Sequence, residues 1–158
     1  MDKEQGIMNT AKLTPEEVHL RACQALVSLF RDQVESNIEC VHSRIFNYVL
    51  HPEQRYVHCA HSEAVKEGVK THPEHVVPCA LMIRECFSFI KEGKYSDDEI
   101  AGFLQKHWKI VTITKEEAKR LDSELGLKST MPEGWHLDSE DTFARFKQAN
   151  IKIIKSSS

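Results

Sequence analysis

Residues 109–126 read KIVTITKEEAKRLDSELG, and this stretch decides the fold class. The run Lys109–Ile113 is rich in β-branched residues, which is typical of a strand. Thr114 is suited to cap a helix, residues 115–125 contain good helix formers, and Gly126 suits a helix end. A strand, a cap and a helix in immediate succession predict a protein of the α+β class.

The first third of the chain predicts a helical scaffold. Thr14-Pro15 has the composition of a helix start, and apolar residues then recur at steps of three and four, which places them on one face of a helix. These residues are Val18, Ala22, Leu26, Leu29, Phe30 and Val34. We expect a second helix over residues 38–50, ending before His51-Pro52 because a residue that precedes proline disfavours helix.

The middle of the chain predicts short strands and two further helices. Residues 55–61 have strand composition, and 71–78 is bracketed by prolines that favour an extended or edge strand. Residues 79–91 should form a helix that ends at Gly93, and Ser96 with Glu99 forms a capping box that opens another helix.

The C-terminal part predicts a loop at 131–135, a short helix over 141–150 and a β-like run at 151–154. We therefore expect one domain over residues 1–158, with flexible ends at 1–13 and 155–158. A helical N-terminal scaffold would pack on a small ββα-like unit with short strands.

Composition limits the functional classes. The net charge of −3 means that binding to nucleic acid would need a local basic face. No apolar run approaches the roughly 20 residues needed to cross a bilayer, and the N-terminus lacks a secretory signal, so the sequence predicts a cytoplasmic protein without a membrane partner. The five cysteines form no CxxC pair and are expected to be reduced.

Histidine and cysteine residues are concentrated between positions 40 and 86. Zn²⁺ prefers four nitrogen or sulfur ligands, and this segment contains enough of them for a structural site. The possible zinc donors are His58, Cys59, His61, His72, His75 and Cys79. The spacing matches no standard zinc finger, so half-buried residues without a ligand are the alternative.

The motif Glu74-His75-Val-Val-Pro78 resembles the first element of the HNH-type, or ββα-metal, nucleases. In that family an acidic residue or a histidine binds a divalent metal ion, the adjacent histidine activates water, and a helix after a second strand supplies another ligand. The resemblance implies that Glu74 is a metal ligand, that His75 is the general base, and that Glu117, or less favourably Glu116, is the ligand on the helix. Mg²⁺ or Mn²⁺ would suit such carboxylates.

This sequence departs from the family pattern in two respects. The family usually carries Asn or His on the helix where this chain has Glu117, and two predicted helices separate the motif from the second strand. The resemblance spans residues 70–125 and implies a metal-dependent hydrolase of DNA or RNA, of the kind found in phages and mobile elements.

A basic strip could serve such an activity by facing phosphates. Its members are Lys115, Lys119, Arg120 and Lys128. The alternative is a solvated helix face with ion pairs at helical spacing.

Two other functions fit the composition. The acidic clusters 97–99 and 138–141 could imitate phosphates in a non-catalytic inhibitor that occludes a protein complex, although acidic turns of this kind are also common as solubilising features. A zinc-stapled interaction module would instead use the His58 to Cys79 donors. His107-Trp108 could form a second functional pair or be buried where a helix meets a strand.

Overall fold

The structure, a computed structural model, describes residues 12–155 of the chain. The flexible ends expected at 1–13 and 155–158 fall largely outside the described residues. Helices and a four-stranded mixed sheet make up the fold, so the predicted α+β class is confirmed. The elements are α2 (Pro15–Ser36), α3 (Ile45–Val49), α4 (Gln54–Val57), β1 (His58–Ser62), β2 (Thr71–His75), α5 (Cys79–Glu92), α6 (Asp97–His107), β3 (Ile110–Thr114), α7 (Lys115–Lys119), the π-helical turn η1 (Arg120–Glu124), α8 (Ala144–Gln148) and β4 (Ile153–Lys155).

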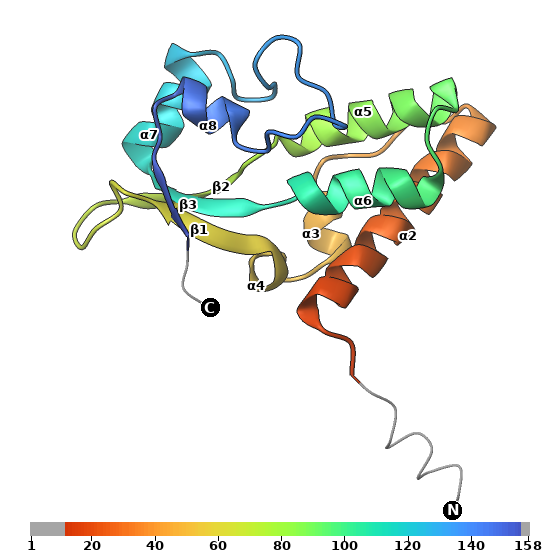
Figure 1. The fold of residues 1–158 in the computed structure, drawn as a ribbon, viewed down its shortest axis with the longest axis horizontal. Helices are drawn as coiled ribbons and strands as arrows, with labels where there is room; N and C mark the ends of the chain where they lie inside the picture. Colours follow the sequence, from red (N-terminus) through yellow and green to blue (C-terminus); the bar gives the residue numbers. More distant parts are fainter. Residues whose placement is uncertain (1–11, 156–158) are drawn as a thin grey trace, which may run out of the picture.

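The sheet has the strand order β2-β3-β1-β4. β3 is antiparallel to β2 and parallel to β1, and β4 is antiparallel to β1. β2 therefore lies at one edge of the sheet, as Pro73 within the strand and Pro78 after it predict. Figure 1 shows α2, α5 and α6 together on the right of the molecule, with α7 and α8 beside the sheet on the left.

The helix α2 begins where the sequence predicts. Thr14 Oγ1 accepts a hydrogen bond from the backbone N–H of Glu17 at 3.1 Å. Asn37 ends the helix in the left-handed conformation, with φ of 56°, and its N–H bonds the carbonyls of Gln33 and Val34. A left-handed residue after the last turn is a common helix stop.

Two hydrophobic clusters form the interior. The first fills the space among α2, α5 and α6, and it includes Phe30, Phe46, Met82, Leu104 and Trp108. The second lies between the sheet and the α7–α8 region, and it includes Val111, Ile113, Leu121, Phe146 and Ile151. Trp108 of the first cluster contacts the site described below.

The predicted helix over residues 38–50 is wrong for most of its length, because only Ile45–Val49 is helical. Ile38 has 57% of its surface exposed, so this stretch has no continuous buried face. Side chains also take up local backbone donors: Gln33 accepts from the N–H of Cys40, and His42 accepts from the N–H of Arg44. Such local bonds compete with helix formation.

The predicted strand over residues 55–61 is also partly wrong. Residues Gln54–Val57 form a helical turn, in which the N–H groups of Tyr56 and Val57 bond the carbonyl of Glu53, and the strand begins at His58. The strand at 109–113 and the helix start at Thr114 are confirmed, although the helix changes to a π-helical turn at Arg120.

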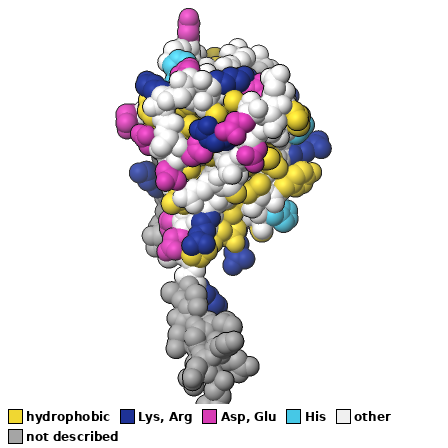
Figure 2. Space-filling model, turned by 90° about the vertical axis from the view of Figure 1, so that its right-hand side faces the viewer, with side chains coloured by type: hydrophobic (Ala, Val, Ile, Leu, Met, Phe, Trp, Pro, Cys, Tyr) yellow, Lys and Arg dark blue, Asp and Glu magenta, His cyan; other side chains and the backbone are white. Residues whose placement is uncertain are grey.

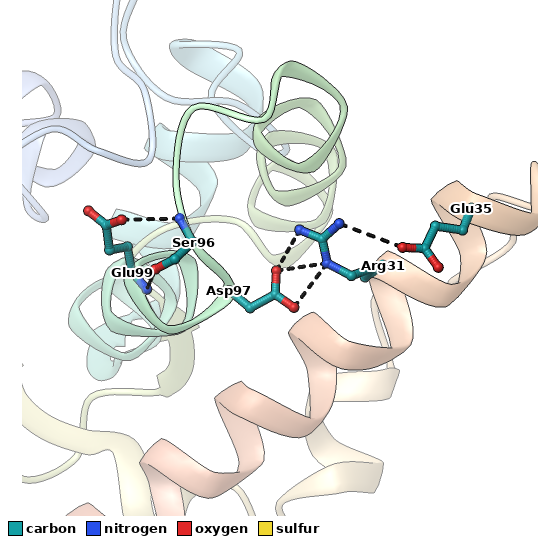
Figure 3. A network of polar contacts seen from close by, with 5 residues as sticks. All are labelled: Arg31, Glu35, Ser96, Asp97 and Glu99. Atoms are coloured by element: carbon teal, nitrogen blue, oxygen red, sulfur yellow. Dashed lines mark hydrogen bonds and ion pairs between the residues drawn. The ribbon is translucent and has the colours of Figure 1, made fainter.

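An ion pair links α2 to the start of α6 (Figure 3). Arg31 Nε donates to both carboxylate oxygens of Asp97, at 2.8 and 2.9 Å, and Ser96 and Glu99 form the predicted capping box beside it. Both partners are partly solvated, and a pair of this kind stabilises a protein by at most about 1 kcal/mol. Asp97 and Glu99 are thus engaged within the chain.

Positive and negative side chains are interspersed on the face that lies to the right in Figure 1, with hydrophobic side chains between them (Figure 2). No helix among the described residues combines the length and the apolar character that crossing a bilayer requires.

Candidate metal centre

Three side chains with metal-binding atoms meet where the first helical region joins the sheet. Glu53 immediately precedes α4, His75 is the last residue of β2, and Cys79 is the first residue of α5. Their carboxylate, imidazole and thiol donor atoms all lie within 4.8 Å of one another. Buried Val76 and Val77 and then Pro78 fix the short connection between His75 and Cys79. A group of donors close enough to bind a metal ion is therefore present.

The carboxylate of Glu53 is the centre of this group. Its Oε2 accepts a hydrogen bond from Trp108 Nε1 at 2.6 Å and lies 2.7 Å from His75 Nε2. With Glu53 ionised, His75 Nε2 carries the proton and donates it to the shared oxygen. Glu53 is 7% exposed, and a buried carboxylate requires such partners.

Trp108 is held in place by aromatic contacts. Its ring makes edge-on contacts with His19 and Phe46, with centroid distances of 4.9 and 4.8 Å. The indole is fully buried, so its N–H has a fixed direction toward Glu53. The donor group is consequently supported by the first hydrophobic cluster.

Arg145 supports His75 from the other side. Its guanidinium is fully buried and donates to the backbone carbonyl of His75, to Glu74 Oε2 at 3.0 Å and to the carbonyl of Leu127 at 2.8 Å. The planar guanidinium thus fixes the end of β2 against α8 and the 127–131 loop. Arg145 and Glu74 therefore form an ion pair.

An open pocket of about 370 Å³ lies beside the donors. Glu53, His75 and Cys79 line it, together with the cationic side chains of Arg44 and Lys128. A ligand in this pocket would lie near the donor group, two positive charges and Glu74, whose carboxylate is paired with Arg145.

Burial raises the pKa of the Cys79 thiol, and the negative charges of Glu53 and Glu74 raise it further. A thiol of this kind is a poor nucleophile at neutral pH because it is protonated. A divalent metal ion would reverse this situation, since coordination deprotonates a thiol. The chemistry of Cys79 therefore suits a metal ligand better than a catalytic nucleophile.

The structure brings His75 into the donor group but separates it from Glu117. His75 pairs with Ile110 and Thr71 pairs with Thr114 in the β2–β3 ladder, so these positions lie at opposite ends of the strands. Four residues of strand correspond to about 13 Å. Glu117 is bonded to the N–H of Thr114, at the far end. The three residues expected from the nuclease resemblance, Glu74, His75 and Glu117, do not converge.

Among the possible zinc donors, His75 and Cys79 lie in the group and the others lie elsewhere. His58 Nε2 bonds the hydroxyl of Thr112 at 2.8 Å, His61 Nδ1 lies 2.9 Å from the carbonyl of Ser62, and His72 Nε2 is 3.6 Å from Glu74. Cys59 packs against the second hydrophobic cluster, where burial raises its pKa.

The expected basic strip is divided between two places. Lys128 lines the pocket beside His75, whereas Arg120 lines a different pocket together with Glu116 and Glu117. Lys115 and Lys119 are exposed on α7. Of these four residues, only Lys128 is placed to contact a ligand of the donor group.

We predict that Glu117 has a structural role. Its Oε1 accepts from Ser62 Oγ and from the N–H of Thr114, so Glu117→Ala should reduce the free energy of unfolding by about 1–3 kcal/mol. Glu117→Gln keeps an acceptor and should cost less. Chemical denaturation measures both effects. A loss of metal affinity in Glu117→Gln without a loss of stability would contradict this role.

Sequence reasoning missed Glu53, Trp108 as its partner, and Arg145. Glu53 follows Pro52 in a stretch without a recognised motif, and Arg145 lies in a short helix far along the chain. The only available signal for Arg145 was an arginine between two phenylalanines on a predicted helix, which suggests burial of a cation. Comparison with known proteins adds no further guide, because no family model, curated protein or solved structure matches the chain.

Proposed function

We infer that the chain binds a divalent transition metal ion through Glu53, His75 and Cys79 and uses it to hydrolyse phosphodiester bonds in nucleic acid. The observation that carries this proposal is the convergence of three donor atoms within 4.8 Å at the wall of an open pocket. Three protein ligands with one position left for solvent or substrate are typical of catalytic zinc sites.

The donor set favours Zn²⁺ over Mg²⁺. Mg²⁺ requires near-octahedral oxygen ligands, whereas a thiolate, an imidazole and one carboxylate suit zinc. When bound, zinc supplies a Lewis acid and lowers the pKa of a coordinated water to about 7. Metal binding by His75 and Glu53 would compete with the hydrogen bond between His75 Nε2 and Glu53 Oε2 and would release protons from the ligands.

The surrounding residues support the donors and the substrate. Trp108 donates to Glu53 and thereby orients the carboxylate, and Arg145 holds the backbone of His75. Partners of this kind around metal ligands commonly affect metal affinity by about 10–100-fold. Arg44 and Lys128 line the same pocket and offer positive charge to a phosphate.

The competing inhibitor hypothesis has less support from the contacts. Five of the six acidic residues on which it depends make contacts within the chain: Asp97 with Arg31, Glu99 with Ser96, Asp138 with Tyr95, Glu140 with Lys106 and Asp141 with Lys147. Phosphate mimicry requires carboxylates that are presented to a partner, so the pocket is the better basis for a function.

Calorimetric titration with Zn²⁺ tests the metal site. The wild-type protein is expected to bind one ion, and His75→Ala and Cys79→Ser should each weaken binding by about 100-fold or more, because each removes one of three ligands. His72→Ala and Cys40→Ser are matched controls, since both residues are exposed and lie outside the donor group. Equal affinity in the site variants and the controls would refute the assignment.

Incubation of plasmid DNA, single-stranded DNA and RNA with the zinc-loaded protein tests the hydrolytic part. Cleavage should require Zn²⁺ and should be lost in His75→Ala but retained in His72→Ala. If the protein binds one zinc ion but cleaves none of these substrates, the site has a structural role and the proposed hydrolysis is wrong.

A further inference from the structure

A second pocket, remote from the metal donors, lies along the last strand of the sheet. This pocket, here called the β4 groove, has a volume of about 520 Å³, which falls in the range of ligand-binding clefts. It is lined by Phe143, Phe146, Ile151 and Ile153, by Lys147, Lys152 and Lys155, and by Asn150. Among residues 12–155, the lining contains apolar and cationic side chains and no acidic one, although the whole chain has a net charge of −3.

The strand beside the groove has a free outer edge. β4 pairs with β1 on one side and is the last strand of the order β2-β3-β1-β4 in the described part of the chain. In Figure 1 the blue segment that leads to the C-terminal label lies beside β1. Backbone N–H and C=O groups on such an edge can pair with a further strand.

The ladder shows which groups are available. The N–H of Glu63 bonds the carbonyl of Lys152, and the register then pairs Ser62 with Ile153 and His61 with Ile154. Because hydrogen-bonded and non-hydrogen-bonded pairs alternate in an antiparallel ladder, the backbone groups of Ile153 point away from β1. Ile154, which is 45% exposed, leaves an apolar side chain at the same edge.

The charges indicate the chemistry of the partner. Lys147 is paired with Asp141 at 3.1 Å, whereas Lys152 and Lys155 make no ion pair with a residue in the range 12–155. Lysine on an edge strand can also serve to discourage pairing between copies. An acidic strand would reverse that effect, because its carboxylates would neutralise the lysines while its apolar side chains enter the groove.

We propose that the β4 groove binds an extended, acidic segment of a partner protein, which adds to the sheet at β4 and places alternate apolar side chains against Phe143 and Ile153. Strand addition of this kind gains affinity from main-chain hydrogen bonds and specificity from pockets for alternate side chains. This inference is independent of the proposed metal centre, since the two pockets share no lining residue.

Four peptides test this proposal. The probe is a capped peptide of four Glu-Val repeats, and the controls are four Lys-Val repeats, the Glu-Val peptide with N-methylated valines, and four Glu-Ser repeats. The probe should bind and should shift the backbone amide signals of residues 143–155 in an NMR titration. Each control lacks either the negative charge, the main-chain donors or the apolar side chains, and each should bind at least about tenfold more weakly.

Variants of exposed residues complete the test. Lys152→Glu combined with Lys155→Glu should weaken binding of the Glu-Val probe by about tenfold or more, and Lys70→Glu, at an exposed position outside both pockets, should leave it unchanged. Circular dichroism confirms that the variants fold. Equal affinity for the N-methylated peptide, or probe binding without signal shifts in residues 143–155, would overturn strand addition at β4. Absence of probe binding at millimolar concentration would overturn it as well.

Discussion

Replacing Arg145 with methionine is expected to lower the free energy of unfolding by about 3–5 kcal/mol, the cost of removing one partner of a buried ion pair. The fully buried guanidinium contacts Glu74 and two backbone carbonyls, those of His75 and Leu127. Methionine fills much of the same volume but leaves these three acceptors without a donor. Urea denaturation followed by circular dichroism measures the loss.

Two further variants define the cause. Arg145→Lys keeps the charge but cannot span three acceptors in a plane, so its stability should lie between those of wild type and Arg145→Met. Lys147→Met changes an exposed cation on the same helix and should cost less than about 1 kcal/mol. A loss below about 1 kcal/mol in Arg145→Met would show that the network contributes little.

Acid is expected to destabilise the protein strongly between about pH 6.5 and pH 4. Burial, with smaller contributions from neighbouring lysines, lowers the pKa of His19 and of His107 from 6.5 to about 4. Below pH 6.5 the unfolded chain binds protons at these positions and the folded chain does not, so stability falls as the pH decreases. Shifts of this size correspond to roughly 3 kcal/mol for each histidine.

The structure gives a reason for both shifts. Nε2 of His19 and Nε2 of His107 are buried without a hydrogen-bond partner among the described residues. The loss of solvation of the charged ring therefore outweighs the opposing effect of Glu53 on His19 and of the Leu137 and Ser139 backbone on His107. His107 Nδ1 is 3.0 Å from the hydroxyl of Thr142, and its ring packs against Trp135.

Denaturation at a series of pH values tests this expectation. Each histidine changes the free energy of unfolding by up to about 1.4 kcal/mol per pH unit. His107→Gln should therefore reduce the slope of the unfolding free energy against pH by about that amount between pH 6.5 and pH 4. His72→Gln, at an exposed position, should leave the slope unchanged. An identical slope in wild type and His107→Gln would exclude His107 as a source of the acid sensitivity.

Local signals account for the parts of the fold that the sequence predicted. Thr14 and Thr114 cap helices with their own side chains, and Ser96 forms a capping box, so these helix starts depend on residues within one turn. The run 109–113 is buried and β-branched and forms a central strand. The α+β class follows from such signals.

The incorrect predictions have a different origin. Residues 38–50 show helical spacing of apolar side chains, yet Ile38 is more than half exposed and local side-chain hydrogen bonds occupy backbone N–H groups. The end of the predicted 115–125 helix widens into a π-helical turn while Leu121 remains in the second cluster. Tertiary packing determined the backbone conformation of both segments, and the local sequence pattern contains no information on that packing.

Part of the candidate site could be predicted from the sequence, and the part that depends on tertiary packing could not. His75 belongs to the recognised motif that ends at Pro78 and Cys79 directly follows it, whereas Glu53 comes from a loop more than twenty positions before His75. Glu117 was chosen because a strand and helix follow the motif in the expected order. Strand register places it at the wrong end, and register depends on long-range pairing that a single sequence does not reveal.

The parallel pairing of β1 with β3 has a consequence for biosynthesis. His58 pairs with Ile110, and the intervening segment contains β2, α5 and α6, so the centre of the sheet cannot close until that whole segment has left the ribosome. Pairing between distant segments is slow, and unpaired strand edges expose a nascent chain to aggregation. Arg145 emerges later still, so the donors contributed by residues 53, 75 and 79 acquire their final support only after residue 145 has left the ribosome.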